Sequence, residues 1–128
     1  MGTPSILIVE DDEDLSLALA VRLQANGYRV ATSPDAIVAL QAVRRNEPDL
    51  VVLDLGLPGG GGLTFLKRLR TLTSLPFIPV IVLTASAGSE ETARAAGAQA
   101  YFEKPPDNDA LLAAVRSHIG APAGSNGP

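Results

Sequence analysis

The stretch VVLDLGLPGGGGL, residues 51 to 63, places a single acid at the end of an apolar run and four consecutive glycines shortly after it. A short continuous run of valine and leucine is typical of a strand that is buried on both faces of a parallel sheet. Burying a carboxylate is costly, so Asp54 needs a reason to stand where that strand ends. The glycines, Gly59 to Gly62, predict a permissive loop that opens the next helix. They lack the Gly-Lys-Ser/Thr that completes a P-loop.

The same alternation of strand and helix patterns extends along the chain in both directions. Apolar or alternating runs predict strands at 5–9, 28–32, 49–53, 78–83 and 100–102. Apolar residues at helical spacing predict helices that begin near 15, 34, 63, 89 and 107 and end near 25, 45, 71, 96 and 119. Ser33, followed by Pro34, is expected to cap the second helix. Five successive strand-helix units predict an α/β fold, with a parallel sheet covered by helices on both faces.

Length and composition narrow the class of protein. The 128 residues suggest one domain over 1–119, followed by a Gly/Pro/Ser-rich tail or linker at 120–128. The absence of cysteine excludes disulfides and thiolate chemistry, and a net charge of −4 argues against nucleic-acid binding. No apolar run is long enough to cross a membrane, and the N-terminus lacks a signal-peptide pattern. We therefore expect a soluble cytoplasmic protein without membrane or direct nucleic-acid contacts.

Polar residues follow the predicted strands at the points where they end. Glu10 and Asp11 follow the first strand, Asp54 the third, Thr84 ends the fourth, and Lys104 follows the fifth. The carboxyl ends of parallel strands meet at one edge of a sheet, and ligands of doubly wound folds bind there. We therefore expect these side chains to converge, which explains why Asp54 ends a buried strand.

The chemistry of this edge favours a metal ion and a phosphoryl group. Two carboxylates about 5 Å apart repel by ~3 kcal/mol at an effective dielectric constant of about 20. Either one stays protonated or a cation lies among them, and oxygen ligands alone favour Mg²⁺ or Mn²⁺. The Lys104 ammonium and the Thr84 hydroxyl could then contact a phosphoryl group. Asp54 would be equipped to attack phosphorus as a nucleophile.

Four motifs carry a resemblance to a known family. They are ILIVEDD, LVVLDLGLPGGGG, VIVLTA and YFEKP, in that order and each at a predicted strand end. Together they resemble the receiver domain of two-component response regulators over about residues 5–119. The resemblance implies a flavodoxin-like sheet with strand order 2-1-3-4-5. It also implies phosphotransfer to Asp54 from a histidine kinase or a phosphotransfer protein.

The resemblance assigns a metal site to the acidic residues. Mg²⁺ would be held by Asp11, Asp54 and the backbone carbonyl of Gly56. Glu10 would act on the ion directly or through water. Asp12, in contrast, is expected to cap the first helix, where its charge suits the helix dipole.

The resemblance also assigns the residues around the phosphoryl group. Lys104 would pair with the group, and the Ala85 N–H and the Thr84 hydroxyl would donate hydrogen bonds to its oxygens. Tyr101 would be an aromatic switch, and the Lys104–Pro105 bond would be cis. Output would pass through the face between the fourth and fifth helices, by homodimerisation or an effector. The protein would be a signalling switch that catalyses its own phosphotransfer and dephosphorylation, rather than a metabolic enzyme.

The sequence departs from the family pattern at three points. These departures affect the expected output face, between the fourth and fifth helices, more than the expected phosphoryl acceptor Asp54. Gly56 lacks the larger side chain that is usual two residues after the acceptor, and Pro106 stands where an aromatic residue often packs. The interval from Thr84 to Lys104 is shorter than usual, so the fourth helix is expected to be short or altered.

Three rival functions stay open at this point. A phosphatase with an aspartate nucleophile would commonly carry a second aspartate where Gly56 stands. A flavodoxin-like module that binds a flavin or nucleotide is the second rival, and a degenerate receiver used only for docking is the third. The complete set of acids, hydroxyl and lysine argues against the degenerate receiver.

Overall fold

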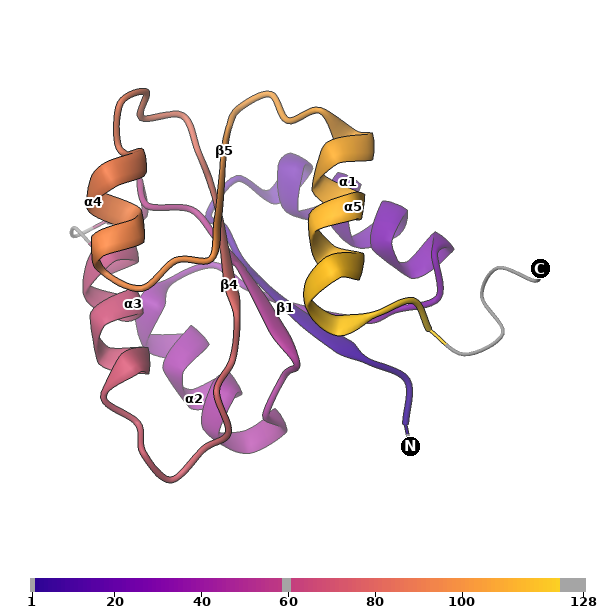
Figure 1. Cartoon of the computed structure of the whole chain (residues 1–128), viewed down its shortest axis with the longest axis horizontal. Helices are drawn as coiled ribbons and strands as arrows, with labels where there is room; N and C mark the ends of the chain where they lie inside the picture. The colour runs from indigo at the N-terminus through magenta and orange to yellow at the C-terminus, as the bar shows by residue number, and fades with distance from the viewer. Residues whose placement is uncertain (1, 59–60, 123–128) are drawn as a thin grey trace.

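The computed structural model describes residues 2–58 and 61–122, and in these residues five strands alternate with five helices (Figure 1). The strands are β1 (Ser5–Val9), β2 (Arg29–Ser33), β3 (Leu50–Leu53), β4 (Val80–Thr84) and β5 (Ala100–Glu103). The helices are α1 (Glu13–Ala25), α2 (Ala36–Asn46), α3 (Gly61–Arg70), α4 (Glu90–Ala95) and α5 (Asn108–Ile119). All paired strands are parallel and the sheet order is β2-β1-β3-β4-β5, which confirms the predicted fold class and strand order.

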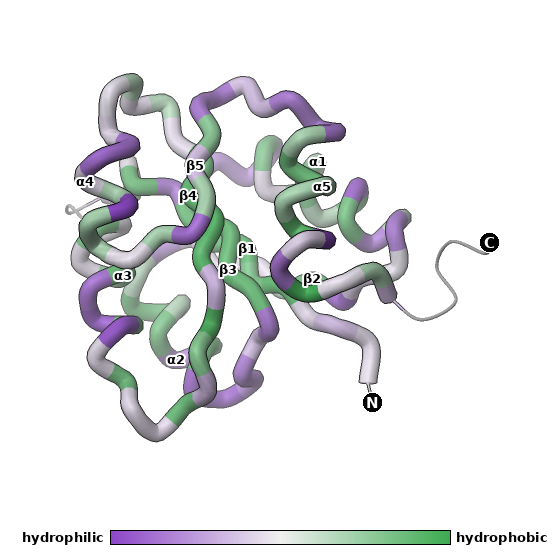
Figure 2. The backbone as a smooth tube through the Cα atoms, in the orientation of Figure 1, coloured by the Kyte–Doolittle hydropathy of each residue, from purple (hydrophilic) through white to green (hydrophobic). Residues whose placement is uncertain are grey.

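Different helices cover the two faces of the sheet. Helices α1 and α5 lie on one face, and α2, α3 and α4 lie on the other (Figure 1). Successive strand residues point to opposite faces, so Ile6 and Ile8 pack on the α1 side and Leu7 and Val9 on the other. The central strands are hydrophobic along their length (Figure 2) because both of their faces are buried. Polar side chains of these strands are consequently placed at the strand ends.

The start of α2 differs from the prediction. Ser33 is the last residue of β2, and its carbonyl accepts a hydrogen bond from the Glu10 N–H at 3.0 Å. Asp35 caps the helix instead, because its side chain accepts from the Val38 N–H at 2.8 Å. Ser33 remains in the strand because it pairs in register with Val9 of β1.

The starts of α1 and β2 can also be compared with the predictions from sequence. Asp12 caps α1 as predicted, and its side chain accepts from the Leu15 N–H at 3.1 Å. Tyr28, predicted to begin the second strand, lies just before β2, and its hydroxyl donates to the Gly120 carbonyl at 2.6 Å. Burial raises the pKa of Tyr28. This contact fixes the end of α5 against the start of β2.

Helix α4 is short, as expected from the reduced interval between the fourth and fifth strands, and comprises six residues. The exposed His118 lies in the last turn of α5, where a cation suits the helix dipole. The predicted loop residues Gly59 and Gly60 lie outside the described residues, as does the tail beyond residue 122. The helices of residues 2–58 and 61–122 include none with the length and apolar character to span a membrane.

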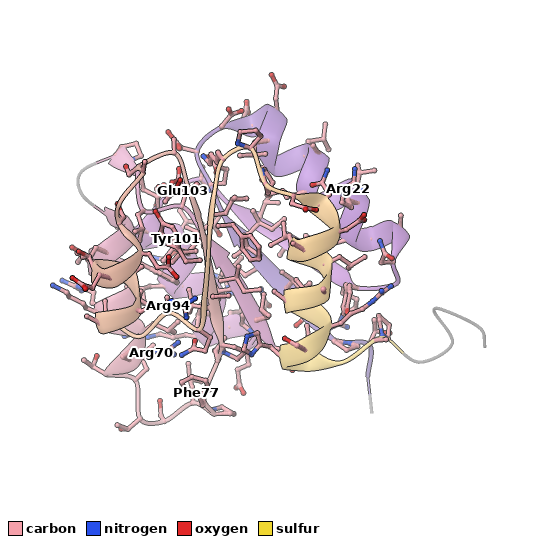
Figure 3. All side chains as sticks on the ribbon, turned by 45° about the horizontal axis from the view of Figure 1, so that its top comes forward. Arg22, Arg70, Phe77, Arg94, Tyr101 and Glu103 are labelled. Carbon is pink, nitrogen blue, oxygen red and sulfur yellow. The ribbon has the colours of Figure 1, made fainter. Side chains whose placement is uncertain are left out.

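Arg70, the last residue of α3, holds the segment between α4 and β5. Its guanidinium donates to the carbonyls of Ile78 and Gly97 and to Gln99 Oε1, each at 2.8 Å. The same group lies over the Phe77 ring, 4.4 Å from its centroid, and both residues are labelled in Figure 3. Burial lowers the pKa of Arg70. These contacts fix the amino ends of β4 and β5, opposite the edge that carries the predicted site.

Candidate functional site

The carboxyl edge of the sheet brings four of the predicted site residues together. Carboxylate oxygens of Glu10, Asp11 and Asp54 lie within 4.8 Å of one another. Lys104 Nζ lies 2.9 Å from Glu10 Oε1 and 3.2 Å from Asp54 Oδ2. The Lys104–Pro105 bond is cis, as expected. The convergence follows from the topology, because β1 and β3 are neighbours and Lys104, just after β5, reaches the residues that follow both strands.

Asp54 is held in a defined orientation by the backbone around it. It follows β3 directly, and its N–H donates to the Val9 carbonyl at 3.0 Å, which continues the pairing with β1. Oδ1 accepts a hydrogen bond from the Gly56 N–H at 2.9 Å, while Oδ2 accepts one from Lys104. The residue is only 6% exposed. The carboxylate therefore has both oxygens hydrogen-bonded although the strand before it is entirely apolar.

Glu10 and Lys104 form the most buried ion pair of this edge, with side chains 3% and 20% exposed. Burial raises the pKa of Glu10, although the hydrogen bond from Lys104 acts in the opposite direction. Burial would lower the pKa of Lys104, but its hydrogen bonds and the charges of Glu10 and Asp54 outweigh that effect and raise it. The ammonium therefore remains charged at neutral pH and offsets part of the repulsion among the carboxylates.

The acidic cluster is a suitable donor set for a hard divalent cation. Its three donors are all carboxylates, and neither histidine nor cysteine is part of the group. Mg²⁺ and Mn²⁺ prefer such oxygen ligands, and Mg²⁺ usually retains several waters. Asp11 is exposed, whereas Glu10 and Asp54 are buried, so the cluster is open to solvent on one side. The residues present thus fit the predicted ion.

The predicted hydroxyl and amide donors lie on the neighbouring strand. Thr84 ends β4 and is fully buried, and its Oγ1 accepts from the Ser86 N–H at 3.2 Å. No hydrogen bond joins Thr84 to Asp54 among the residues that the structure describes. Ala85 follows directly and is exposed. Tyr101 lies half-buried on β5, and its hydroxyl contacts the loop between β4 and α4.

Gly62 supports the site, although sequence reasoning did not single it out. A Cβ atom at this position would lie 2.4 Å from the Asp54 carbonyl oxygen and 2.5 Å from Leu55 Cα. Only glycine therefore lets the first turn of α3 pack against the backbone that carries Asp54. The run of four glycines hides this requirement, because nothing in the pattern distinguishes Gly62 from the others.

Comparisons with curated proteins find similar chains that are regulators. The chain is 34% identical over 125 residues to the transcriptional regulatory protein CseB of Streptomyces avermitilis, covering 96% of this chain and 52% of that protein. It is 35% identical over 120 residues to the polar-differentiation response regulator DivK of Brucella ovis, covering 92% of this chain and 98% of DivK. The chain thus spans about half the length of CseB and nearly all of DivK.

Comparisons with solved structures likewise find receiver domains of response regulators. The BeF3-activated N-terminal receiver domain of RstA from Klebsiella pneumoniae matches with a TM-score of 0.81 and 32% identity, over 89% of this chain and 97% of that one. A CheY-like receiver domain protein from Methanospirillum hungatei matches with a TM-score of 0.83 and 28% identity, over 91% and 93% of the two chains. The family model described as response regulator receiver domain matches residues 6–116. This match covers most of a chain that has the predicted strand order and acidic edge, and the chain therefore belongs to the response regulator receiver domain family.

Proposed function

We propose that this chain is the phosphoacceptor of a two-component or phosphorelay system and that Asp54 receives the phosphoryl group from a histidine kinase or a phosphotransfer protein. The observation that carries the proposal is the buried Asp54 carboxylate, which pairs with Lys104 and lies against two further carboxylates. The domain would act in the cytoplasm as a switch that catalyses its own phosphotransfer and dephosphorylation.

In the proposed reaction, an Asp54 oxygen attacks phosphorus, and the bond between phosphorus and the donor group breaks. The product is an acyl phosphate on Asp54, and the donor leaves with the electron pair of the broken bond. The Lys104 ammonium, which lies 3.2 Å from Asp54 Oδ2, would pair with the transferred oxygens. The Thr84 hydroxyl and the Ala85 N–H would donate the remaining hydrogen bonds after a local adjustment of the loop.

Divalent-cation chemistry belongs to the same proposal. Asp11, Asp54 and the Gly56 carbonyl would hold Mg²⁺ or Mn²⁺, with Glu10 acting directly or through water. The bound ion would neutralise negative charge that develops as the phosphoryl group is transferred. The signal would then pass from Tyr101 to a homodimer partner or an effector on the face formed by α4, β5 and α5.

Mg²⁺-dependent labelling tests this function. Incubation with acetyl phosphate and Mg²⁺ should add one phosphoryl group, seen as a single increment in intact mass, and EDTA should prevent it. Asp11→Asn removes one hard ligand and should weaken Mg²⁺ binding by about tenfold, measured by titration of NMR shifts. Asp12→Asn removes the same charge from a capping residue and serves as the control. Labelling that persists in EDTA, or equal Mg²⁺ affinity in the Asp11 variant, would contradict the proposal.

Gly56 predicts a short lifetime for the phosphoryl group, because it places no side chain over Asp54. A Cβ at position 56 would lie 3.4 Å from Asp54 Oδ1, which is ordinary contact, and the backbone there is not left-handed. Gly56→Met and Gly56→Arg should therefore fit and hinder water from attacking in line. We expect the phosphoryl group to be lost about three- to tenfold more slowly, which corresponds to a barrier about 1 kcal/mol higher.

The decay of labelled protein after removal of acetyl phosphate measures this lifetime. The Mg²⁺ affinity of each Gly56 variant should also be measured. A lower affinity would show that the new side chain displaces the backbone carbonyl of residue 56, whereas an unchanged affinity would attribute slower decay to shielding of the phosphoryl group from water. Unchanged affinity together with unchanged or faster decay would show that shielding at this position is unimportant.

A further inference from the structure

The Tyr101 hydroxyl lies at the centre of a hydrogen-bond network between β5 and the loop before α4. Its oxygen lies 3.0 Å from the Ser86 carbonyl oxygen and 3.1 Å from Glu103 Oε2. It also accepts a hydrogen bond from the Ser89 N–H at 3.2 Å. Tyr101 and Glu103 both lie on the α4 side of β5 (Figure 3). The network therefore joins a strand of the sheet to residues 86–89.

A phenolic hydroxyl has one proton, yet two acceptors lie within hydrogen-bond distance of Tyr101. The proton can be donated to the Ser86 carbonyl or to the Glu103 carboxylate, but not fully to both. A hydrogen bond to an ionised acceptor is roughly twice as strong as one to a neutral acceptor. Glu103 therefore competes with Ser86 for Tyr101.

Glu103 also holds the loop at a second point. The same oxygen, Oε2, accepts from the Gly88 N–H at 3.1 Å. Gly88 has a φ of 83°, a left-handed conformation that glycine adopts readily. Glu103 pairs in register with Thr84 on the neighbouring strand, so it reaches the loop directly after Thr84. One exposed carboxylate thus fixes both the switch tyrosine and the tip of the loop.

Ser86 connects this network to the proposed phosphoryl site. Its N–H donates to Thr84 Oγ1 at 3.2 Å, while its carbonyl accepts from Tyr101. Under the proposed function, the Thr84 hydroxyl turns toward a phosphoryl group on Asp54. That movement is transmitted to Ser86, and the loop can follow only if its contacts with Glu103 are released.

We propose that Glu103 is a positioning residue that holds Tyr101 and the 86–89 loop in their observed arrangement and thereby opposes the switch. The inference rests on the proposed phosphorylation of Asp54 and adds a residue that regulates the same site. Removing the carboxylate lowers the cost of rearranging the loop, and the switched state becomes more populated. Because ligand binding and switching are coupled, a phosphoryl analogue then binds more tightly.

Beryllofluoride with Mg²⁺, a phosphoryl analogue for Asp54, provides the test. Glu103→Gln keeps a neutral acceptor for Gly88 and Tyr101, and we expect its beryllofluoride affinity to rise about threefold. Glu103→Ala removes both contacts, and we expect a rise of about tenfold. Amide NMR shifts of Gly88 and Ser89 in the analogue-free variants should move toward their analogue-bound positions.

Two controls separate positioning from a general effect of charge or stability. Glu91→Gln removes the same charge from an exposed residue of α4 whose side chain makes no hydrogen bond within residues 2–58 and 61–122, and it should leave affinity unchanged. In a Tyr101→Phe background, the effect of Glu103→Gln should shrink to the part that acts through the Gly88 N–H, because the contact with the hydroxyl is absent. An additive effect in the double variant would overturn the proposal.

The outcomes also separate this proposal from the proposed function. If the parent chain binds beryllofluoride and both Glu103 variants bind it equally or more weakly, Glu103 does not oppose the switch. If the parent chain neither binds beryllofluoride nor accepts a phosphoryl group, the proposed function itself fails.

Discussion

Asp54→Ala is expected to abolish the transfer of a phosphoryl group from acetyl phosphate under conditions in which the parent chain takes up one group. Alanine has no nucleophilic oxygen, and Glu10, the other buried carboxylate of the edge, is engaged by Lys104 at 2.9 Å and by the Asp12 N–H at 3.1 Å. Intact-mass measurement during incubation with acetyl phosphate and Mg²⁺ checks the result. A thermal melt of the variant verifies that it remains folded.

Asp12→Ala is the matched control, because Asp12 belongs to the same acidic run but serves α1. Its side chain accepts from the Leu15 N–H, so alanine should cost about 1 kcal/mol of stability through loss of the cap. Phosphoryl uptake should continue, since Asp12 is outside the cluster of converging carboxylates. Uptake at the parent rate in the Asp54 variant would identify a different acceptor.

Gly62→Ala is expected to destabilise the fold by about 3 kcal/mol, the upper end of the usual cost of overpacking, because the new methyl group meets backbone atoms. Alanine ordinarily stabilises a helix by about 1 kcal/mol relative to glycine, so the sign of the effect is informative. Here the new methyl group would lie 2.4 Å from the Asp54 carbonyl oxygen and 2.8 Å from the Leu55 carbonyl carbon. Either α3 or the segment that carries Asp54 must move.

Urea unfolding of Gly62→Ala measures this cost, and Gly56→Ala supplies the same chemical change at a site with ordinary contacts. We expect the Gly56 variant to unfold close to the parent concentration of urea and the Gly62 variant well below it. Phosphoryl uptake by Gly62→Ala should fall together with stability, because the displaced backbone holds Asp54, the proposed acceptor. Equal unfolding midpoints for Gly62→Ala and the parent chain would contradict the steric argument.

The order of the strands and helices and the convergence of polar residues at one edge of the sheet could be predicted from sequence. Both depend on the periodic spacing of apolar residues and on the common direction of parallel strands. Short apolar runs within 5–9 and 49–53 favour buried strands, because they are too short for buried helices and lie between helical patterns. Parallel strands joined by helices place their carboxyl ends at one edge, so Asp54, Asp11 and Lys104 meet although they are far apart in sequence.

The features that sequence reasoning missed depend on contacts without a periodic signature. Ser33 and Asp35 are both good capping residues, and the difference is decided by the pairing of β1 with β2, which retains Ser33 in the strand. Arg70 and Glu103 look like ordinary surface charges until the fold places backbone groups of another segment beside them. The constraint on Gly62 likewise arises only where α3 packs on the backbone after β3.

The position of Lys104 between Glu10 and Asp54 has a consequence for the ionic balance of the edge. With every group ionised, three carboxylates and one ammonium leave two uncompensated negative charges. A doubly charged cation cancels this excess without displacing the lysine, whereas a monovalent ion cancels only half of it. If the edge binds a cation as proposed, the lysine would act as a built-in counterion that sets the preferred valence of that ion, and sodium or potassium should compete poorly even when they are in large excess.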